Sequence, residues 1–309
     1  MNEEKYHLPA SDKKSLHVYE WLPSKGKIKG IIQIIHGMAE HAGRYREFAE
    51  ELTNCGYFVI AGDLRGHGKT EKTMEDLGFF AGTNGWEIVL EDLFLINAGA
   101  RKKFPGLPVF LLGHSMGSFF ARDYAHTYGD RIAGVLLSGT GGDPGIMGEV
   151  GIFLAKREIK KNGKRHRSRL LDNLLFGNFN KRFKNTITKF DWLSRDKEKV
   201  NAYVADPLCG YVPTSIFFLD LFGGVKKINK KINISKMPED LPMLFLSGRK
   251  DPVGNNGRGV VQICKKYKKN KNISLKLYKE GRHEMLNEIN RKAVYCDVVN
   301  WLDNLAVKK

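Results

Sequence analysis

The sequence predicts an α/β fold in which a mostly parallel central sheet is flanked by helices and interrupted by one inserted segment. Three observations lead to this prediction. Short β-rich apolar runs recur along the chain, helical stripes separate them, and the alternation stops between residues 143 and 240. Near-continuous apolar runs are typical of strands that are covered on both faces, as in parallel sheets. Strands that alternate with helices define the α/β class.

Seven strands are expected, and most of them end at Gly, Asp or Ser: Leu16–Trp21, Ile31–Ile35, Tyr57–Ile60, Val109–Leu112, Val135–Leu137, Met243–Leu246 and Ile273–Leu277. Apolar residues at helical spacing from Trp86 onward predict a helix between the third and fourth strands. Asn84 is the expected N-cap of that helix, with Glu87 reaching back to it. A second stripe predicts a helix at the end of the chain, through Val294, Val298, Trp301, Leu302 and Leu305.

The chain is expected to divide into a core, residues 1–142 and 241–309, and an inserted lid segment, residues 143–240. The lid segment has 20 Lys and Arg against 11 Asp and Glu, and residues 241–309 have 15 against 6, so each carries a net charge of +9. Residues 1–142 have 16 against 17. Such asymmetry indicates a contact with nucleic acid or an anionic membrane, or else a lysine-rich solvated surface.

The location of the protein is predicted from three simpler features. The N-terminal residues are of mixed charge and do not resemble a signal peptide. The longest apolar runs are too short to span a bilayer. The four cysteines are scattered without a CxxC pair, which suits a reducing compartment. We therefore expect a cytoplasmic protein, with peripheral membrane association as an option.

A single serine, Ser115, lies in "GHSMG" between a predicted strand and a helical run. G-x-S-x-G in this context is a nucleophile elbow, in which Gly113 and Gly117 leave room for a strained turn that exposes the hydroxyl. A serine in an ordinary turn is the alternative. Met116, at the start of the helix, offers a backbone N–H to an oxyanion. Met38, in the loop after the second strand, is the expected second donor.

A serine hydroxyl becomes an effective nucleophile when a base takes its proton and an acid orients that base. Among the histidines after Ser115, His283 is the expected base because it follows the last predicted strand. His126 lies in the helix just after the serine, and His166 lies in the basic run "KNGKRHRSR". Asp251, directly after the strand Met243–Leu246, is the expected acid. Asp143, past the preceding strand, stays open as the alternative.

The motifs "HGMAEHAGRY", "DLRGHGKT", "GHSMGS" and "GRHEMLNE", with the Asp251 turn, resemble the monoglyceride lipase and lysophospholipase branch of the serine α/β-hydrolases, which is similar to serine aminopeptidases of family S33. The resemblance covers nearly the whole core. It implies an α/β-hydrolase fold with a lid, acyl-ester substrates, a triad of Ser115, Asp251 and His283, and Met38 and Met116 as oxyanion donors. The sequence departs from the family at Lys69-Thr70 and in its very basic lid, which leaves the exact substrate open.

We therefore expect a hydrolase of carboxylic esters, first of all monoacylglycerols or lysophospholipids. An S33-type aminopeptidase, a thioesterase and a C–C hydrolase share the triad, and a catalytically inactive binding protein is the non-enzyme alternative. The aminopeptidase would need lid carboxylates to bind an amine, whereas this lid is net basic. The lid joins apolar residues to a basic run at 156–169, which suggests contact with an anionic membrane. The apolar residues are Ile146, Met147, Val150, Ile152, Phe153 and Leu154.

No cofactor, metal or nucleic acid is expected. "GHGKT" lacks the first glycine of a P-loop, because Asp63 stands at that position. "HGMAEH" is one residue too long for a zinc motif, and we expect Glu40 and His41 to brace their loop instead. The basic runs lack the interleaved aromatic residues of a groove that binds single strands. The oligomeric state stays open.

Overall fold

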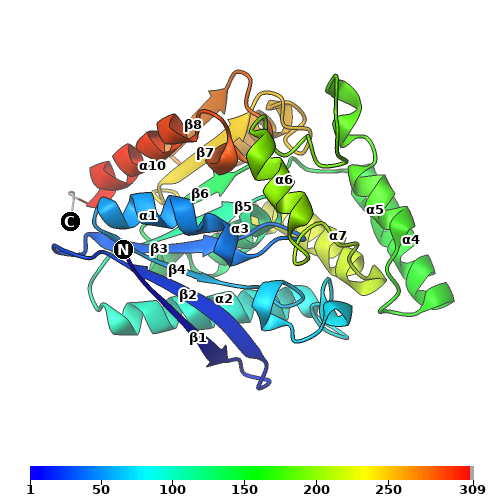
Figure 1. Ribbon diagram of the computed structural model, residues 1–309, viewed down its shortest axis with the longest axis horizontal. Coiled ribbons are helices and arrows are strands. Elements are labelled where there is room, and N and C mark those ends of the chain that lie inside the picture. Colours follow the sequence, from blue (N-terminus) through cyan, green and yellow to red (C-terminus); the bar gives the residue numbers. More distant parts are fainter. Residues whose placement is uncertain (307–309) are drawn as a thin grey trace.

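The computed structural model describes residues 1–306, and one eight-stranded sheet runs through its centre (Figure 1). The strand order is β1-β2-β4-β3-β5-β6-β7-β8. The first two pairings, β1 with β2 and β2 with β4, are antiparallel, and the remaining five are parallel. The bounds are β1 (Asn2–Pro9), β2 (Ser15–Leu22), β3 (Gly30–Ile35), β4 (Tyr57–Gly62), β5 (Val109–His114), β6 (Gly134–Ser138), β7 (Met243–Gly248) and β8 (Ile273–Tyr278). The predicted α/β class and mostly parallel sheet are confirmed.

All seven predicted strands are present, and each agrees with its prediction to within two residues at either end. The strand that the sequence analysis did not predict is β1. It lies at the edge of the sheet, pairs with β2 alone, and is exposed along most of its length. A strand with both faces near water needs no alternation of apolar and polar residues, so β1 has no hydrophobic pattern to detect.

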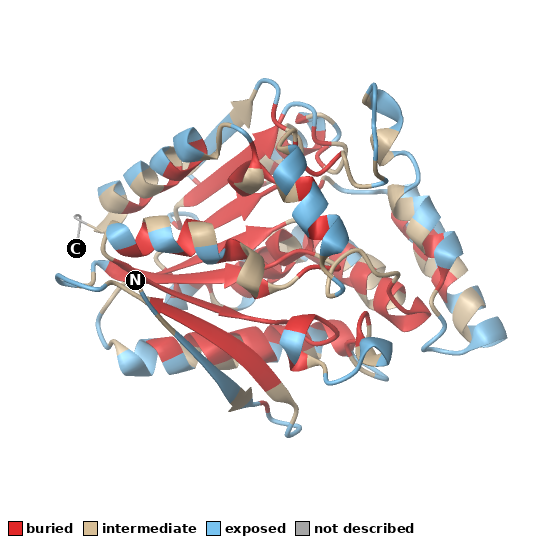
Figure 2. Ribbon diagram, in the orientation of Figure 1, coloured by how far each residue is buried: buried red, intermediate tan, exposed pale blue. Residues whose placement is uncertain are grey.

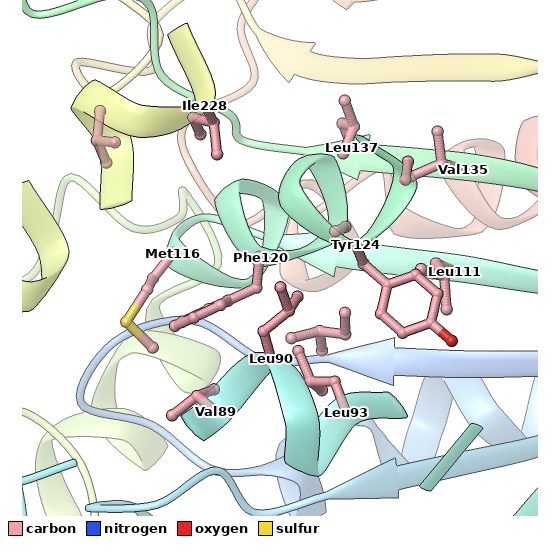
Figure 3. Close-up of a cluster of buried hydrophobic side chains, with 14 of the residues drawn as sticks. Val89, Leu90, Leu93, Leu111, Met116, Phe120, Tyr124, Val135, Leu137 and Ile228 are labelled. Atoms are coloured by element: carbon pink, nitrogen blue, oxygen red, sulfur yellow. The ribbon is translucent and has the colours of Figure 1, made fainter. Parts of the chain in front are cut away.

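Helices cover both faces of the sheet. On one face lie α1 (Arg46–Asn54) and α10 (Arg291–Ala306), and on the other α2 (Gly85–Lys103), α3 (Met116–Tyr128) and α9 (Arg258–Lys266). The strands from β2 to β7 are almost entirely buried, whereas the two edge strands, β1 and β8, and the outer faces of the helices are largely exposed (Figure 2). Figure 3 shows how the side chains of α2 and α3 pack together against the strands: Val89, Leu90, Leu93, Phe120, Tyr124, Leu111, Val135 and Leu137. This packing holds α3, and therefore the residue before it, in place.

The predicted cap of α2 is wrong. The helix begins at Gly85, but Asn84 has a left-handed backbone (φ 54°) and its side chain makes no capping hydrogen bond. A capping side chain needs an extended backbone at that position. Glu87 does not reach back either, since its carboxylate lies 3.5 Å from the ammonium of Lys227. The expected stripe of α10 is confirmed, because Val294, Val298 and Leu302 are all buried.

Between β6 and β7 the chain forms a group of helices without a named strand: α4 (Ile146–Asn162), α5 (Arg169–Phe176), α6 (Lys197–Ala205), α7 (Ser215–Asn229) and α8 (Lys231–Ile234). Helix α4 packs against α7 and α5. Figure 1 shows α4 and α5 at the right-hand edge, beyond the sheet. The division at residues 143 and 240 stays a prediction. Short 3-10 turns complete the description: η1 (Ala42–Tyr45), η2 (Gly68–Thr70), η3 (Met74–Asp76), η4 (Gly129–Arg131), η5 (Phe179–Arg182) and η6 (Met285–Asn287).

Within residues 1–306, none of the helices combines the length and the apolar character that crossing a bilayer requires.

Candidate active site

Ser115 occupies a strained turn between β5 and α3. Its backbone angles are φ 52° and ψ −120°, which L-residues rarely adopt. Glycine neighbours are required, because a β-carbon on Gly113 would lie 2.3 Å from the carbonyl oxygen of Gly117. A β-carbon on Gly117 would lie 2.1 Å from the carbonyl oxygen of Ile35. The turn leaves the Ser115 side chain partly exposed at the carboxyl end of the sheet.

His283 and Asp251 form a buried pair after β8 and β7. The distance between His283 Nδ1 and Asp251 Oδ1 is 3.0 Å, and the side chains are 2% and 0% exposed. The Val253 N–H donates to the same carboxylate oxygen at 2.9 Å. Burial lowers the pKa of His283, but the Asp251 carboxylate outweighs it, so the pKa lies above its usual value. The pair therefore stabilises an imidazolium and leaves Nε2 for a second partner.

Asp143, the alternative acid, lies elsewhere. Its carboxylate forms a 2.5 Å ion pair with Lys266 and accepts the Gly145 N–H at 3.0 Å. Among residues 1–306, the carboxylate that hydrogen-bonds His283 is that of Asp251. Asp143 lies at the wall of an apolar cavity instead. The geometry therefore favours Asp251 as the partner of the imidazole.

The two expected oxyanion donors both belong to segments next to Ser115. A β-carbon on Gly37 would lie 3.2 Å from Ser115 Cβ, so the loop that carries Met38 approaches the serine closely. The Met38 N–H has no hydrogen-bond partner among the described residues. Met116 is the first residue of α3, where an N–H has no intrahelical acceptor. Its side chain is buried in the core beside α3 (Figure 3), which holds this amide in place.

Sequence reasoning expected Glu40 to brace its loop but missed how it does so. Glu40 accepts the Gly37 N–H at 2.6 Å and the Tyr45 hydroxyl at 2.8 Å. The Arg44 guanidinium bonds Glu40 and donates twice to Glu284, each at 2.8 Å. Burial raises the pKa of both glutamates, but Arg44 outweighs it and holds each pKa below its usual value. Because Arg44 and Glu284 are 240 positions apart, no local pattern could have revealed this link between the Met38 loop and the residue after His283.

The lid segment completes the site. The Trp192 ring lies 5.0 Å from the His283 ring, and the Trp192 carbonyl accepts the His283 N–H at 3.4 Å. The ring of His114, the residue before Ser115, is tilted against the His283 ring, with 4.7 Å between the ring centroids. Burial and the neighbouring His283 lower the pKa of His114 to about 4, so this imidazole is neutral at pH 7.

Two cavities meet at Ser115. The first, about 300 Å³, has a mixed lining, in which Phe190, Trp192 and Leu193 stand beside polar side chains that include His114, Asp172, Asn173, Asn180, Lys189 and Tyr211. We call it the polar cavity because it is the more polar of the two. The second, about 350 Å³, is mainly apolar and includes Phe119, Leu174, Leu175, Phe179, Leu221 and Phe222. Met38, Ser115 and Phe176 line both. A bound molecule that spans the two cavities would therefore pass directly over the serine hydroxyl.

The strained serine at the carboxyl end of β5, beside a buried histidine–carboxylate pair that follows it in the chain, defines the α/β-hydrolase class. A sequence profile described as serine aminopeptidase, S33 (Hydrolase_4) matches residues 26–290, and the chain belongs to this family.

Relatives extend over most of the chain. It is 29% identical to a monoacylglycerol lipase of Mycolicibacterium smegmatis, across 92% of each protein. It is 28% identical to human monoglyceride lipase, across 96% of this chain and 89% of the human one. A thermostable carboxyl esterase from Bacillus coagulans superposes with a TM-score of 0.91 at 26% identity, across 99% of both chains. The predicted family is confirmed, and the chain is a serine hydrolase of the esterase and lipase kind.

Proposed function

We propose that this protein hydrolyses carboxylic esters that join a long acyl chain to a small polar alcohol, monoacylglycerols or lysophospholipids first of all. Ser115 Oγ attacks the ester carbonyl, and His283 Nε2 takes its proton. The Met38 and Met116 amides stabilise the oxyanion, for which one such donor typically contributes about 3–4 kcal/mol. His283 then gives its proton to the leaving alcohol, while Asp251 stabilises the imidazolium. Water repeats the sequence on the acyl-enzyme and releases the fatty acid.

The observation that carries this proposal is the pair of cavities that meet at Ser115. An acyl chain suits the apolar cavity, which Phe119, Leu175 and Phe222 line. The alcohol suits the polar cavity, where Asn173, Asn180 and other polar groups can bond hydroxyls. The names of the relatives agree, since monoglyceride lipases are among them.

The aminopeptidase alternative needs a free carboxylate near the serine to bind an ammonium group. Glu40 and Glu284 line the polar cavity but are both paired with Arg44. Asp172 is the remaining acidic side chain of that cavity, and burial raises its pKa, with Lys189 opposing the shift. A carboxyl whose ionisation is disfavoured, beside a lysine, suits hydroxyl groups better than a second cation.

A substrate panel tests the proposal. It contains p-nitrophenyl esters of graded chain length, a monoacylglycerol, a lysophosphatidylcholine, the methyl ester of the same fatty acid, an acyl thioester and an aminoacyl anilide. We expect the monoacylglycerol or lysophospholipid to exceed the matched methyl ester in kcat/KM, because only they fill the polar cavity. Ser115→Ala should lower kcat by about 10⁴-fold or more while the protein stays folded. Hydrolysis of the anilide without hydrolysis of any ester would refute the proposal.

We further infer that the lid segment contacts an anionic lipid surface through α4. Four apolar side chains of this helix are exposed: Ile146, Met147, Val150 and Phe153. Residues spaced three and four apart share one helical face, and Arg157, Lys160 and Lys161 continue that face toward the end of α4. An apolar patch followed by a basic one is what a segment that docks onto lipid requires.

Not all of the basic residues in the run at 156–169 are free to contact lipid. Arg165 pairs with Asp76 at 3.0 Å, and the ammonium of Lys164 donates to the Gly82 carbonyl at 2.7 Å, so both serve the fold. We therefore place the contact on Arg157, Lys160 and Lys161. Each such charge near an anionic surface contributes about 1 kcal/mol, so three supply about 3 kcal/mol, or roughly 150-fold in partitioning.

Vesicle co-sedimentation measures this contact. The triple substitution Arg157→Gln, Lys160→Gln and Lys161→Gln should weaken binding to phosphatidylserine vesicles at low salt and leave hydrolysis of a soluble ester unchanged. The matched control removes three other exposed lysines, Lys25, Lys27 and Lys102. Equal losses in both triples, or binding that ignores salt, would refute the inference.

A further inference from the structure

A third cavity, of about 890 Å³, opens between the lid segment and the core and shares only Asn255 with the cavities at Ser115. Four stretches that are far apart in the sequence line it: 182–184, 195, 249–258 and 279–282. Eight of its twelve lining residues are basic, and one, Glu280, is acidic. We call this cavity the basic basin. Its basic residues are Arg182, Lys184, Arg195, Arg249, Lys250, Arg258, Lys279 and Arg282.

Two of the eight basic side chains build the wall of the basin. Arg195 Nε donates to the buried Glu288 at 2.9 Å. The Arg282 guanidinium donates to the Asp191 carbonyl and, at 3.2 Å, to the Ser194 carbonyl. It also lies 4.2 Å from the centre of the Phe183 ring. These contacts join the lid segment to the loop that carries His283, and they hold the wall of the basin in place.

The other six basic side chains are exposed, and none of them forms an ion pair with an acidic group of residues 1–306. Arg282 also keeps its charge, because its hydrogen-bond partners are backbone carbonyls, so these seven cations and Glu280 leave a net charge of +6 around one cavity. Like charges gathered on a concave surface repel one another and raise the local concentration of anions. Helix α9 begins at Arg258, and the positive end of its dipole adds to the same field. A multiply charged anion would remove this repulsion.

We propose that the basic basin binds a small anion with at least two phosphoryl groups. Three of the free side chains are arginines, whose planar guanidinium binds phosphate through two parallel hydrogen bonds. Each phosphoryl group carries up to two negative charges, so two of them balance most of a charge of +6 and three balance all of it. A single phosphate could contact only part of a cavity this large. Phe183, the one aromatic residue of the basin, is covered by Arg282 and offers no platform for stacking nucleotide bases.

Such a ligand would bridge the lid segment and the core. Arg182 and Lys184 belong to the lid segment, whereas Arg249 and Lys250 directly precede Asp251. An anion bound between the two sides holds them together in the folded state only. Binding therefore stabilises the protein against unfolding in proportion to the logarithm of the ligand concentration. The same chemistry is found in soluble polyphosphates and in phosphorylated lipid headgroups.

Isothermal titration with sodium tripolyphosphate tests the proposal on the full chain. We expect saturable one-to-one binding in 20 mM NaCl, at least tenfold tighter than that of inorganic phosphate or sulfate, and a matching rise in Tm. The triple substitution Lys184→Gln, Arg258→Gln and Lys279→Gln should weaken it at least tenfold. The triple substitution at Lys25, Lys27 and Lys102 removes the same charge and should change it less than twofold. Without the anion, both triple variants should hydrolyse p-nitrophenyl butyrate within twofold of the wild-type rate. This result would show that both variants fold.

Two further arms identify the source of the phosphoryl groups. Inositol trisphosphate represents the soluble form, and phosphatidylcholine vesicles with phosphatidylinositol bisphosphate represent the lipid form, with phosphatidylserine vesicles of equal charge as the control. Binding in either arm that the basin triple weakens supports the proposal. Tripolyphosphate binding that is no tighter than that of sulfate, or that both triples weaken equally, would overturn it. Vesicle binding that ignores the basin triple, without binding of either soluble polyphosphate, would overturn it too.

Discussion

Replacing Arg44 by Met should destabilise the protein by about 3–5 kcal/mol at pH 8, because the change leaves two buried carboxylates without their shared cation. The Arg44 side chain is 12% exposed, and those of Glu40 and Glu284 are 4% and 5% exposed. Methionine keeps most of the apolar stem of arginine, so the loss is mainly one of charge and hydrogen bonds. The Gly37 N–H and the residue after His283 depend on this cluster, so kcat should also fall.

The size of this effect should depend on pH. In the wild-type protein the pKa values of Glu40 and Glu284 are lower than in the unfolded chain. The two carboxylates therefore contribute their full stabilisation at any pH above the unfolded-state pKa. This contribution is lost as the pH falls through the folded-state pKa. Without Arg44, burial alone remains, and it raises both pKa values. The folded variant then binds protons more tightly than the unfolded chain and regains stability as the pH falls. The difference between wild type and variant should therefore narrow from pH 8 to pH 5.

Urea unfolding followed by tryptophan fluorescence at both pH values measures this difference. Arg46→Met is the matched control, since Arg46 is 59% exposed and pairs with Glu3 on the surface at 3.0 Å. Such pairs contribute about 0–1 kcal/mol, so the control should change little at either pH. A loss below about 1 kcal/mol for Arg44→Met at pH 8, or an equal loss at pH 5, would refute the reasoning.

Three further predictions concern the triad, the apolar cavity and the lid. Asp251→Asn should lower kcat for an ester by about 10⁴-fold, whereas Asp143→Asn should leave it nearly unchanged; the reverse result would move the acid to the earlier strand. Leu175→Trp should fill the apolar cavity and lower kcat/KM for long-chain esters at least tenfold more than for the acetate ester. Leu170→Trp is the control and should have no such effect, because Leu170 is 52% exposed and lies outside both cavities. Burial and Glu87 raise the pKa of Asp220 to about 7, so the folded state loses stability as the pH rises from about 4 to 7. Asp220→Asn should therefore raise Tm at pH 8 and change it little at pH 5; a lower Tm at pH 8 would contradict this.

Local patterns were enough for the parts of the fold that depend on local physics. Buried parallel strands need continuous apolar runs, so each of them could be read directly from the chain. The turn at Ser115 excludes any side chain at Gly113 and Gly117, so its glycines mark it in the sequence. The chain order of serine, acid and histidine then pointed to Asp251 and His283. The edge strand β1 and the left-handed backbone of Asn84 were not predicted. An exposed strand needs no hydrophobic pattern, and a left-handed residue has no clear sequence signal.

The sequence by itself determined the α/β class, the family and the residues at which the chemistry is expected, because each depends on steric or hydrophobic demands that neighbouring residues meet. Only the tertiary structure decided which carboxylate hydrogen-bonds His283 and how Arg44 links two distant loops. It alone brought the basic residues of 182–195 and 249–282 around one cavity, although the sequence already showed both segments to be basic. The sequence does not show which residue a charged or polar side chain will contact, because that partner depends on how the strands and the lid segment pack.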